Sequence, residues 1–441
     1  MNITMIGTGY VGLVSGAGLA DFGMTVICVD KDEERIKQLK RGVLPFYEPG
    51  LEELIERNVK NGRLFFETDL NSAVERSLVI FVAVGTPDNG QGQTDLSQIE
   101  EVALSLGELI NEYKVLVIKS TVPVGTNRWF KSQVEKKLKP GIEIDIVSNP
   151  EFLREGSAVA DFMRPDRVVI GTESLRALAI MKDIYRALYL IETPFVFTNL
   201  ETAELIKYAA NAFLATKISF INEVANFCDK IGADVHQVAK ALGLDKRIGP
   251  KFLHPGPGFG GSCFPKDTLA FVDQGRKFGS PLTIVEAVIK VNQNQRKLMV
   301  EKIEKALGGV LEGKTIGVLG LTFKPNTSDV RESPAIEIIR ALLNKGAKIK
   351  AYDPEGINEF KKVVESEDLS YGTDAYSVAQ GADALVILTE WNEFRNLNLE
   401  KLKKLLRQPV LLDLRNIYEP EKMAALGYRY VGVGRGNSRK N

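Results

Sequence analysis

Short apolar runs alternate with amphipathic stretches over the first part of the chain. Six runs have the length and composition of buried strands: Ile3–Ile6, Thr25–Val29, Leu78–Val84, Val115–Lys119, Ile144–Val147 and Val168–Ile170. Apolar positions at helical spacing lie between them, for example over Val11–Phe22 and Leu51–Asn61. Strands that alternate with helices are typical of βαβ units, so the pattern predicts a parallel sheet covered by helices.

The pattern changes at Thr198. Thr198 and Glu201 have the spacing of a capping box, and neither glycine nor proline follows until Gly232. Apolar residues then recur roughly at helical spacing, at Ala209, Ala212, Phe213, Phe220, Val224 and Phe227. We therefore expect one long helix here, and a second from Pro281, behind a Ser280 cap, to about Leu307.

Alternation returns in the last third of the chain. Four further strands are expected at Thr315–Leu319, Lys348–Tyr352, Ala384–Leu388 and Val410–Leu412. The pattern thus predicts an α/β protein with two Rossmann-like doubly wound domains, joined by a central helical domain that contains a long helix. We expect the domains at residues 1–198, 199–311 and 312–434, followed by a disordered tail at 435–441.

Composition excludes several function classes. Lys and Arg together number 57, as do Asp and Glu, so the zero net charge argues against a protein that coats nucleic acid or an anionic membrane. With only two histidines, His236 and His254, a histidine-based mechanism or metal site is not expected. Three cysteines form no disulfide framework, and neither a signal peptide nor a membrane span is apparent, so we expect a cytoplasmic protein.

A glycine-rich turn follows the first predicted strand. Gly7-Thr8-Gly9-Tyr10-Val11-Gly12 has the G-x-G-x-x-G spacing that lets backbone approach a pyrophosphate at a helix N-terminus. Asp30 ends the second strand, where an acid binds the ribose 2′-hydroxyl of NAD. The sequence therefore predicts NAD binding. A purely structural glycine turn remains the alternative, and Arg35 leaves NADP open because an arginine there accepts a 2′-phosphate.

A second glycine-rich segment carries a thiol. Pro255–Gly261 precedes Ser262-Cys263-Phe264-Pro265-Lys266-Asp267, and Pro265 suits the first turn of a helix. Cys263 would then lie at a helix N-terminus beside Lys266, an environment that favours the thiolate. We interpret Cys263 as a nucleophile, with a buried unreactive cysteine as the alternative; Cys28 and Cys228 are interpreted as packing residues. A thiol beside an NAD site suggests oxidation of an alcohol to an aldehyde, capture as a thiohemiacetal, and oxidation to a thioester that water cleaves.

Four segments together resemble the nucleotide-sugar 6-dehydrogenases: Gly7–Gly12, Asn149–Gly156, Phe259–Asp267 and Phe323–Arg331. The resemblance extends from Met1 to about Arg415 and is nearest to the members that act on UDP-glucose. It implies oxidation of UDP-glucose to UDP-glucuronate with two NAD⁺ and water. Alternatives are a GDP-mannose 6-dehydrogenase, another nucleotide-sugar 6-dehydrogenase, a non-catalytic NAD or nucleotide-sugar sensor and, more remotely, a 3-hydroxy acid dehydrogenase.

The resemblance also implies roles for individual residues. Cys263 is the implied nucleophile, and Lys207 and Asn211 hold the oxygen at C6. Asp267 positions a water with help from Thr121, and Glu151 activates water for thioester hydrolysis; a solvated Lys207 and a loop-bracing Glu151 are the alternatives. The group that takes the first hydroxyl proton stays open.

Binding residues carry over in the same way. The implied cofactor contacts are Gly7, Gly9, Tyr10, Val11, Gly12, Asp30, Arg35, Thr86, Thr121, Glu155, Lys266 and Arg331. The implied substrate contacts are Glu151, Phe152, Leu153, Arg154, Glu155, Lys207, Asn211, Arg247, Phe252, Leu253, His254, Pro255, Gly256, Gly260 and Lys324. The resemblance implies that the last domain holds the uridine end. Its turn at Gly317–Lys324 lacks the G-x-G-x-x-G pattern, which is consistent with a ligand other than a second dinucleotide. Arg247 would reach the substrate across a subunit interface, which implies a homodimer or a higher oligomer.

Overall fold

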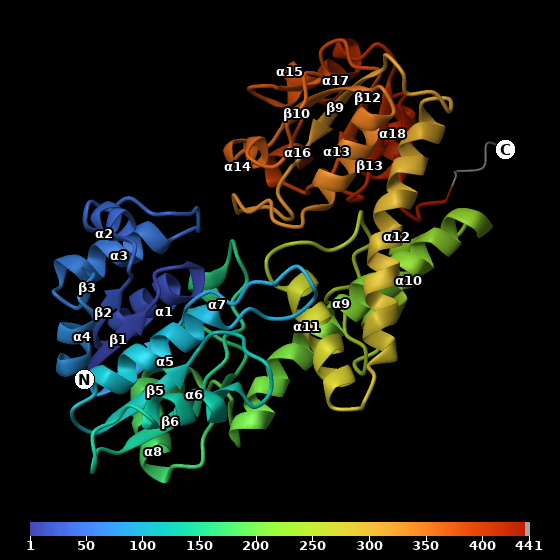
Figure 1. The fold of residues 1–441 in the computed structure, drawn as a ribbon. Helices are drawn as coiled ribbons and strands as arrows, with labels where there is room; N and C mark the ends of the chain where they lie inside the picture. Colours follow the sequence, from blue (N-terminus) through green and yellow to red (C-terminus); the bar gives the residue numbers. More distant parts are fainter. Residues whose placement is uncertain (437–441) are drawn as a thin grey trace. The chain divides into compact units, whose positions relative to one another are not determined.

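The computed structural model describes residues 1–436 and divides the chain into two compact units. The first unit holds Met1–Ala210 and Asp273–Ser280, and the second holds Asn211–Val272 and the chain from Pro281 onward. Each unit is built on one β-sheet with helices packed against it (Figure 1).

The sheet of the first unit has eight strands in the order β3-β2-β1-β4-β5-β6-β7-β8. All neighbours are parallel except β6 and β7, which meet antiparallel at Ser148 and Gly171. The strands are β1 (Asn2–Ile6), β2 (Thr25–Val29), β3 (Leu64–Glu67), β4 (Val79–Val82), β5 (Lys114–Ile118), β6 (Ile144–Ser148), β7 (Val168–Gly171) and β8 (Phe195–Thr198). The helices of this unit are α1 (Tyr10–Asp21), α2 (Glu33–Lys40), α3 (Leu51–Lys60), α4 (Leu70–Arg76), α5 (Ser97–Leu109), α6 (Thr126–Glu135), α7 (Ala158–Met163), α8 (Leu175–Ile184) and the 3₁₀ turn η1 (Arg186–Ile191).

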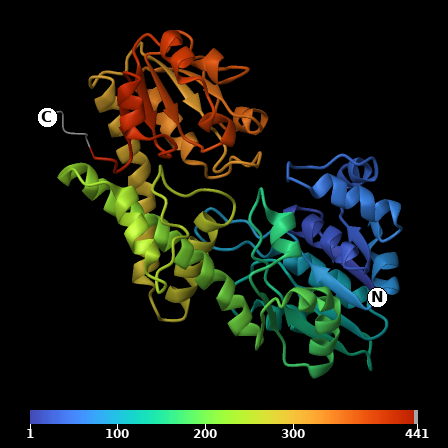
Figure 2. The same cartoon turned by 180° about the vertical axis from the view of Figure 1, so that it is seen from behind.

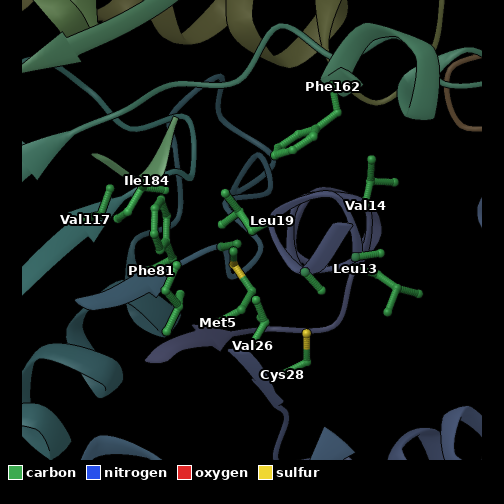
Figure 3. Packing of buried hydrophobic residues seen from close by; sticks show 14 of the residues in the cluster. Met5, Leu13, Val14, Leu19, Val26, Cys28, Phe81, Val117, Phe162 and Ile184 are labelled. Carbon is green, nitrogen blue, oxygen red and sulfur yellow. The ribbon is translucent and has the colours of Figure 1, made fainter. Parts of the chain in front are cut away.

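The largest apolar cluster of this unit packs α1 and other helices against the sheet. Figure 3 shows Met5, Val26 and Cys28 from the strands beside Leu13 of the helix. A Cβ at Gly16 would lie 2.6 Å from the Cys28 sulfur, so the helix needs glycine there to pack this closely on the strand. Cys28 is thus a buried packing residue, as predicted.

The second unit joins a helical segment to a six-stranded parallel sheet. The long helix α9 (Leu200–Ile231) begins in the first unit and continues into the second, followed by α10 (Val235–Leu244), α11 (Phe264–Lys277) and α12 (Thr283–Ala306). Helix α12 packs along α9 (Figure 2). Between them, Asn226 Nδ2 donates to Gln295 Oε1 at 2.7 Å. The sheet has the order β11-β10-β9-β12-β13-β14.

That strand order matches the first six strands of the other sheet, which is the doubly wound Rossmann order. The strands are β9 (Thr315–Leu319), β10 (Lys348–Tyr352), β11 (Leu369–Tyr371), β12 (Ala384–Ile387), β13 (Val410–Asp413) and β14 (Arg429–Gly432). The helices are α13 (Pro334–Asn344), α14 (Ile357–Lys361), α15 (Ala375–Ala379), α16 (Asn392–Arg395), α17 (Leu399–Leu405) and α18 (Pro420–Ala425). The predicted fold class, including both sheets and the long helix, is confirmed.

Both predicted helix caps are wrong. Thr198 is the last residue of β8, and Asn199 caps α9 instead, because its Oδ1 accepts from Thr202 N at 2.9 Å. Helix α12 begins at Thr283 rather than Pro281, and its N-cap residue Leu282 makes no side-chain cap. Capping depends on backbone geometry that spacing alone does not determine.

The end of the chain is bound to the second unit as far as it is described. Arg435 belongs to the segment expected to be a disordered tail, yet its side chain is buried and contacts Glu419 at 2.9 Å and Asp234 at 3.3 Å. Residues 437–441 of that predicted tail lie outside the described residues. Within residues 1–436, no helix combines the length and the apolar character that crossing a membrane requires.

Candidate active site

The glycines of the first turn, Gly7–Gly12, serve two different purposes. Gly7 has a φ of +99°, and a Cβ at Gly12 would lie 1.9 Å from the Gly7 carbonyl oxygen, so packing of the turn requires both. A Cβ at Gly9, the N-cap residue of α1, would meet no atom within 4 Å. Packing within the chain therefore does not require Gly9. The open backbone at this helix N-terminus fits the pyrophosphate of a dinucleotide.

Asp30 follows β2 and holds the same turn. Its Oδ2 accepts from Thr8 N at 2.8 Å and from Thr8 Oγ1 at 2.7 Å. Burial raises the pKa of Asp30, but these hydrogen bonds, one from Asp32 N and the charge of Arg35 outweigh burial and lower it overall. Arg35 lies 3.3 Å from Asp30 and 3.6 Å from Asp32. Because the carboxylates of Asp30 and Asp32 neutralise Arg35, this arginine is less suited to bind a 2′-phosphate. The Asp30 carboxylate can instead accept hydrogen bonds from the ribose hydroxyls of NAD.

The equivalent acid in the second sheet is used differently. Asp353 follows β10 as Asp30 follows β2, and its Oδ2 accepts from Leu321 N, Thr322 N and Trp391 Nε1 at 2.7, 3.0 and 3.1 Å. Only 1% of Asp353 is exposed. The side chain of Trp391 and the backbone after β9 thus use the position where a ribose would bind, so this domain does not present the dinucleotide site of the first.

Lys207 and Glu151 form a buried ion pair. Lys207 lies on α9, Glu151 follows β6, and Nζ lies 3.0 Å from Oε1 with 4% and 7% of the two side chains exposed. Glu151 also accepts from Leu153 N at 2.5 Å, and the Lys207 ammonium lies 5.3 Å from the ring centre of Phe152. Lys207 is therefore not a solvated lysine. Desolvation offsets much of the attraction in such a pair, which points to function rather than to stability alone.

Lys119 lies in the same buried region and was not predicted. It follows β5, and its Nζ donates to Asn149 Oδ1 at 3.1 Å and lies 3.5 Å from the Tyr185 hydroxyl. Burial lowers the pKa of Lys119 to about 8; the charge of Glu151 opposes this shift and that of Lys207 adds to it. The sequence signal was a lysine directly after the apolar run 115–118.

The Lys119 pKa leads to a pH-dependent stability. Below pH 8 the lysine is charged in both folded and unfolded chains, so the full cost of burying it is present. Between pH 8 and 10.5 only the unfolded chain keeps the proton, and stability rises with pH. We expect the folded protein to gain about 2 kcal/mol relative to a Lys119→Met variant between pH 7 and pH 9.5. Urea denaturation of both proteins at the two pH values measures this difference, and a difference independent of pH would contradict it.

The predicted substrate segment Phe152–Glu155 is held from two sides. Arg154 Nη2 lies 2.5 Å from Asp161 Oδ1, and Arg167 lies over the Phe152 ring at 3.5 Å. The buried carboxylate of Glu48, a residue not predicted, accepts from Gly156 N at 2.6 Å and from Ala158 N at 2.7 Å. Glu48 also accepts from the Tyr10 hydroxyl, and so connects the cofactor turn to the substrate segment. No local signal indicated this residue, since its partners lie far away in sequence.

Two predicted cofactor residues of the first unit lie together. Thr86 Oγ1 donates to the Thr121 carbonyl at 2.9 Å, and Thr86 is buried. Val11 lies in the first turn of α1 and Glu155 in the substrate segment, both half-buried. All cofactor contacts expected in the first unit thus follow the ends of β1, β2, β4, β5 and β6, at the carboxyl edge of a parallel sheet where nucleotides bind.

Cys263 lies directly before α11 in the second unit. Its carbonyl accepts from Asp267 N at 2.9 Å, and Pro265 lies in the first turn of the helix, as predicted. Asp267 is buried and accepts from Asn211 Nδ2 and from Lys266 Nζ, each at 2.6 Å. Cys263 is half-buried, whereas Cys228 is buried in the apolar core. A thiol, a buried carboxylate, an amide and a lysine thus meet at one helix N-terminus, where anions are stabilised.

The remaining predicted residues lie in loops of the second unit. Arg247 and Arg331 are exposed, and each binds the carboxylate two residues earlier, that of Asp245 or Asp329, at 2.6 and 2.7 Å. Lys324 Nζ lies 5.5 Å from the ring centre of its neighbour Phe323. Leu253, Pro255, Gly256 and Gly260 are buried, Phe252 is half-buried with a φ of +65°, and His254 is exposed. The predicted site residues therefore belong partly to the first unit and partly to the second.

Comparison with known proteins relates nearly the whole chain to one family. Sequence models of the UDP-glucose/GDP-mannose dehydrogenase family match residues 1–189 as the NAD binding domain, 201–294 as the central domain and 317–420 as the UDP binding domain. The UDP-glucose 6-dehydrogenase of Rhizobium meliloti is 52% identical over 99% of this chain and 100% of its own length. The UDP-glucose 6-dehydrogenase TuaD of Bacillus subtilis is 51% identical over 98% and 93%.

A solved structure gives the same relationship in three dimensions. The UDP-glucose dehydrogenase of Pyrobaculum islandicum superposes with a TM-score of 0.91 at 39% identity, covering 98% of this chain and 97% of its own. The glycine turn, the Lys207–Glu151 pair and the helix after Cys263 all lie within the residues that the family models match. The chain therefore belongs to the UDP-glucose/GDP-mannose dehydrogenase family.

Proposed function

We propose that this protein oxidises UDP-glucose to UDP-glucuronate in two successive NAD-dependent steps. The observation that carries the proposal is Cys263, which follows a buried glycine loop and directly precedes α11, the helix that carries Asp267 and Lys266. Relatives about half identical over nearly the whole chain are UDP-glucose 6-dehydrogenases. A thiol at that position is the group that the second oxidation needs.

NAD⁺ bound at the first turn supplies the hydride acceptor for each oxidation. The C6 alcohol loses a hydride and its hydroxyl proton, which gives an aldehyde. Cys263 Sγ then adds to the aldehyde carbon, and the thiol proton passes to the carbonyl oxygen to form a thiohemiacetal. Loss of a second hydride and proton gives a thioester. Attack by water breaks the carbon–sulfur bond, releases the carboxylate and restores the thiol.

Other polar residues serve this sequence of steps. We assign Lys207 and Asn211, one turn apart on α9, to the oxygen at C6, where a cation and an amide stabilise developing negative charge. Asp267 and Thr121 position water, and Glu151 takes its proton in thioester hydrolysis. Arg154, Glu155, Lys324 and the loop from Phe252 to Gly260 bind the substrate. The cofactor is bound by the glycine turn, Asp30 and Thr86. Glu155, Lys266 and Arg331 also contact it.

The test is a panel of nucleotide sugars. The purified protein is incubated with UDP-glucose, GDP-mannose or an N-acetylated UDP-sugar, each with NAD⁺ or NADP⁺, while reduced cofactor is followed by absorbance. We expect reduction with UDP-glucose and NAD⁺, and UDP-glucuronate as the product. Reduction with GDP-mannose but not with UDP-glucose would overturn the proposal.

We also propose a homodimer formed through α9, in the cytoplasm. Phe213, Phe220 and Phe227 are seven residues apart on this helix and 66%, 52% and 63% exposed, so they form an apolar stripe along one face. A second copy of the chain would cover the stripe. It would also bring Arg247 of each chain to the substrate bound by the other. Light scattering should give the mass of two or more chains; the mass of one chain would contradict the dimer.

The three domains are assigned to residues 1–198, 199–311 and 312–434.

A further inference from the structure

The loop that leads to Cys263 is buried although it forms no helix or strand. Residues 255–261 are all buried, and none belongs to a helix or a strand. Backbone N–H and C=O groups in such a loop lose their water and need partners from elsewhere in the protein. Where those partners come from determines how firmly the loop, and the thiol two residues beyond it, is held.

Side-chain amides from two helices supply the partners. Asn222 Oδ1 on α9 accepts from Gly256 N at 2.8 Å, and Gln295 Nε2 on α12 donates to Gly256 O at 2.8 Å. Asn292, one turn before Gln295, accepts from Phe259 N at 2.8 Å and donates to Phe259 O at 3.0 Å. The three side chains are 0%, 1% and 5% exposed in the order Asn222, Gln295, Asn292. The backbone N–H and C=O groups of both Gly256 and Phe259 thus have hydrogen-bond partners, as they would in a sheet.

The same loop is fixed to the segment that carries Lys324 and Arg331. Arg296 Nη2 donates to Phe259 O at 3.0 Å and to Glu332 O at 3.1 Å, and Gly261 N donates to Arg331 O at 2.9 Å. A Cβ at Gly260 would lie 2.2 Å from Glu332 O, so the loop fits this segment only without a side chain there. All of these groups belong to the second unit.

We propose that Asn222, Asn292 and Gln295 are positioning residues that fix the loop so that Cys263 meets the aldehyde before the aldehyde escapes. The inference rests on the proposed role of Cys263 as nucleophile. The first hydride leaves an alcohol carbon and needs no thiol, whereas the second leaves only after the carbon–sulfur bond has formed. A displaced thiol therefore slows capture of the aldehyde and leaves the first oxidation intact.

Asn292→Ala tests the proposal because it removes both hydrogen bonds to Phe259. The assay measures NADH and UDP-glucuronate together, with semicarbazide present to trap any released aldehyde. Each completed turnover gives two NADH per UDP-glucuronate, and each escaped aldehyde adds one NADH without acid. We expect kcat for the acid to fall about 10- to 100-fold and the NADH-to-acid ratio to rise well above two. Trapped aldehyde is identified by mass spectrometry.

Asn294→Ala is the matched control, since Asn294 lies on the same helix but is exposed. It should keep both the wild-type rate and the ratio of two. If Asn292→Ala does not fold, Asn292→Asp replaces it, because aspartate keeps the size and the acceptor but loses the donor to Phe259 O. A ratio that stays at two in a folded variant, whether the rate falls or not, would overturn the positioning role. Wild-type protein that makes no UDP-glucuronate would instead overturn the proposed function.

Discussion

Replacing Cys263 by alanine should abolish UDP-glucuronate formation while leaving NAD⁺ binding unchanged. Without the sulfur no thiohemiacetal forms, so the second hydride has no bound donor and the carboxylate is not made. We expect kcat for the acid to fall by at least about 10³-fold, the order seen when a covalent nucleophile is removed. Chromatography of the nucleotide products measures this loss, and titration of NAD⁺ by calorimetry checks that the cofactor domain is intact.

Cys228→Ala is the matched control for this prediction. Cys228 lies in the apolar core of the same unit, so its loss should lower stability slightly and leave turnover unchanged. Cys263→Ser keeps a smaller and weaker nucleophile and should stall with substrate-derived material attached or form no net acid. Full turnover by Cys263→Ala would refute the nucleophilic role.

The strands that the apolar pattern predicted, and those it missed, differ in their place in the sheets. All ten predicted strands lie inside a sheet, whereas the four missed strands, β3, β8, β11 and β14, are the outer strands of the two sheets. Interior parallel strands are covered on both faces and are continuously apolar, as in β4 and β12, whose residues are all buried. β3 alternates buried and exposed positions, and β11 has no buried residue, so neither stands out from a loop.

Local and long-range parts of the candidate site also differ in how well the sequence indicated them. The glycine turn, Asp30 and the Cys263 helix are encoded within short segments, because a turn or a helix start depends on a few neighbouring residues. Glu48 and Lys119 could not be predicted in this way. Glu48 contacts residues 38 and 108–110 positions away, and Lys119 contacts residues 30 and 66 positions away. Only the folded sheet brings these groups together.

Removing one partner of the Lys207–Glu151 pair should cost both stability and turnover. In Lys207→Met the carboxylate of Glu151 stays buried without the Lys207 ammonium. In Glu151→Gln the Lys207 ammonium stays buried without the Glu151 carboxylate. Breaking a buried pair from one side typically costs about 3–5 kcal/mol, and the loss of a group that stabilises an oxyanion typically costs about 10²–10³ in kcat. Urea denaturation measures the first effect, and NADH formation with UDP-glucose measures the second.

The double variant Lys207→Met/Glu151→Gln separates the two effects. Because neither Lys207 nor Glu151 then leaves its partner's charge buried alone, we expect it to recover much of the stability that either single variant loses. Turnover should not recover, since both the cation at the C6 oxygen and the base for water are then missing. Lys230→Met on the same helix is the control: Lys230 is exposed, so stability should change by less than about 0.5 kcal/mol and turnover not at all. Recovery of turnover in the double variant would mean that the pair only supports the fold, and the roles of Lys207 and Glu151 in the reaction would have to be abandoned.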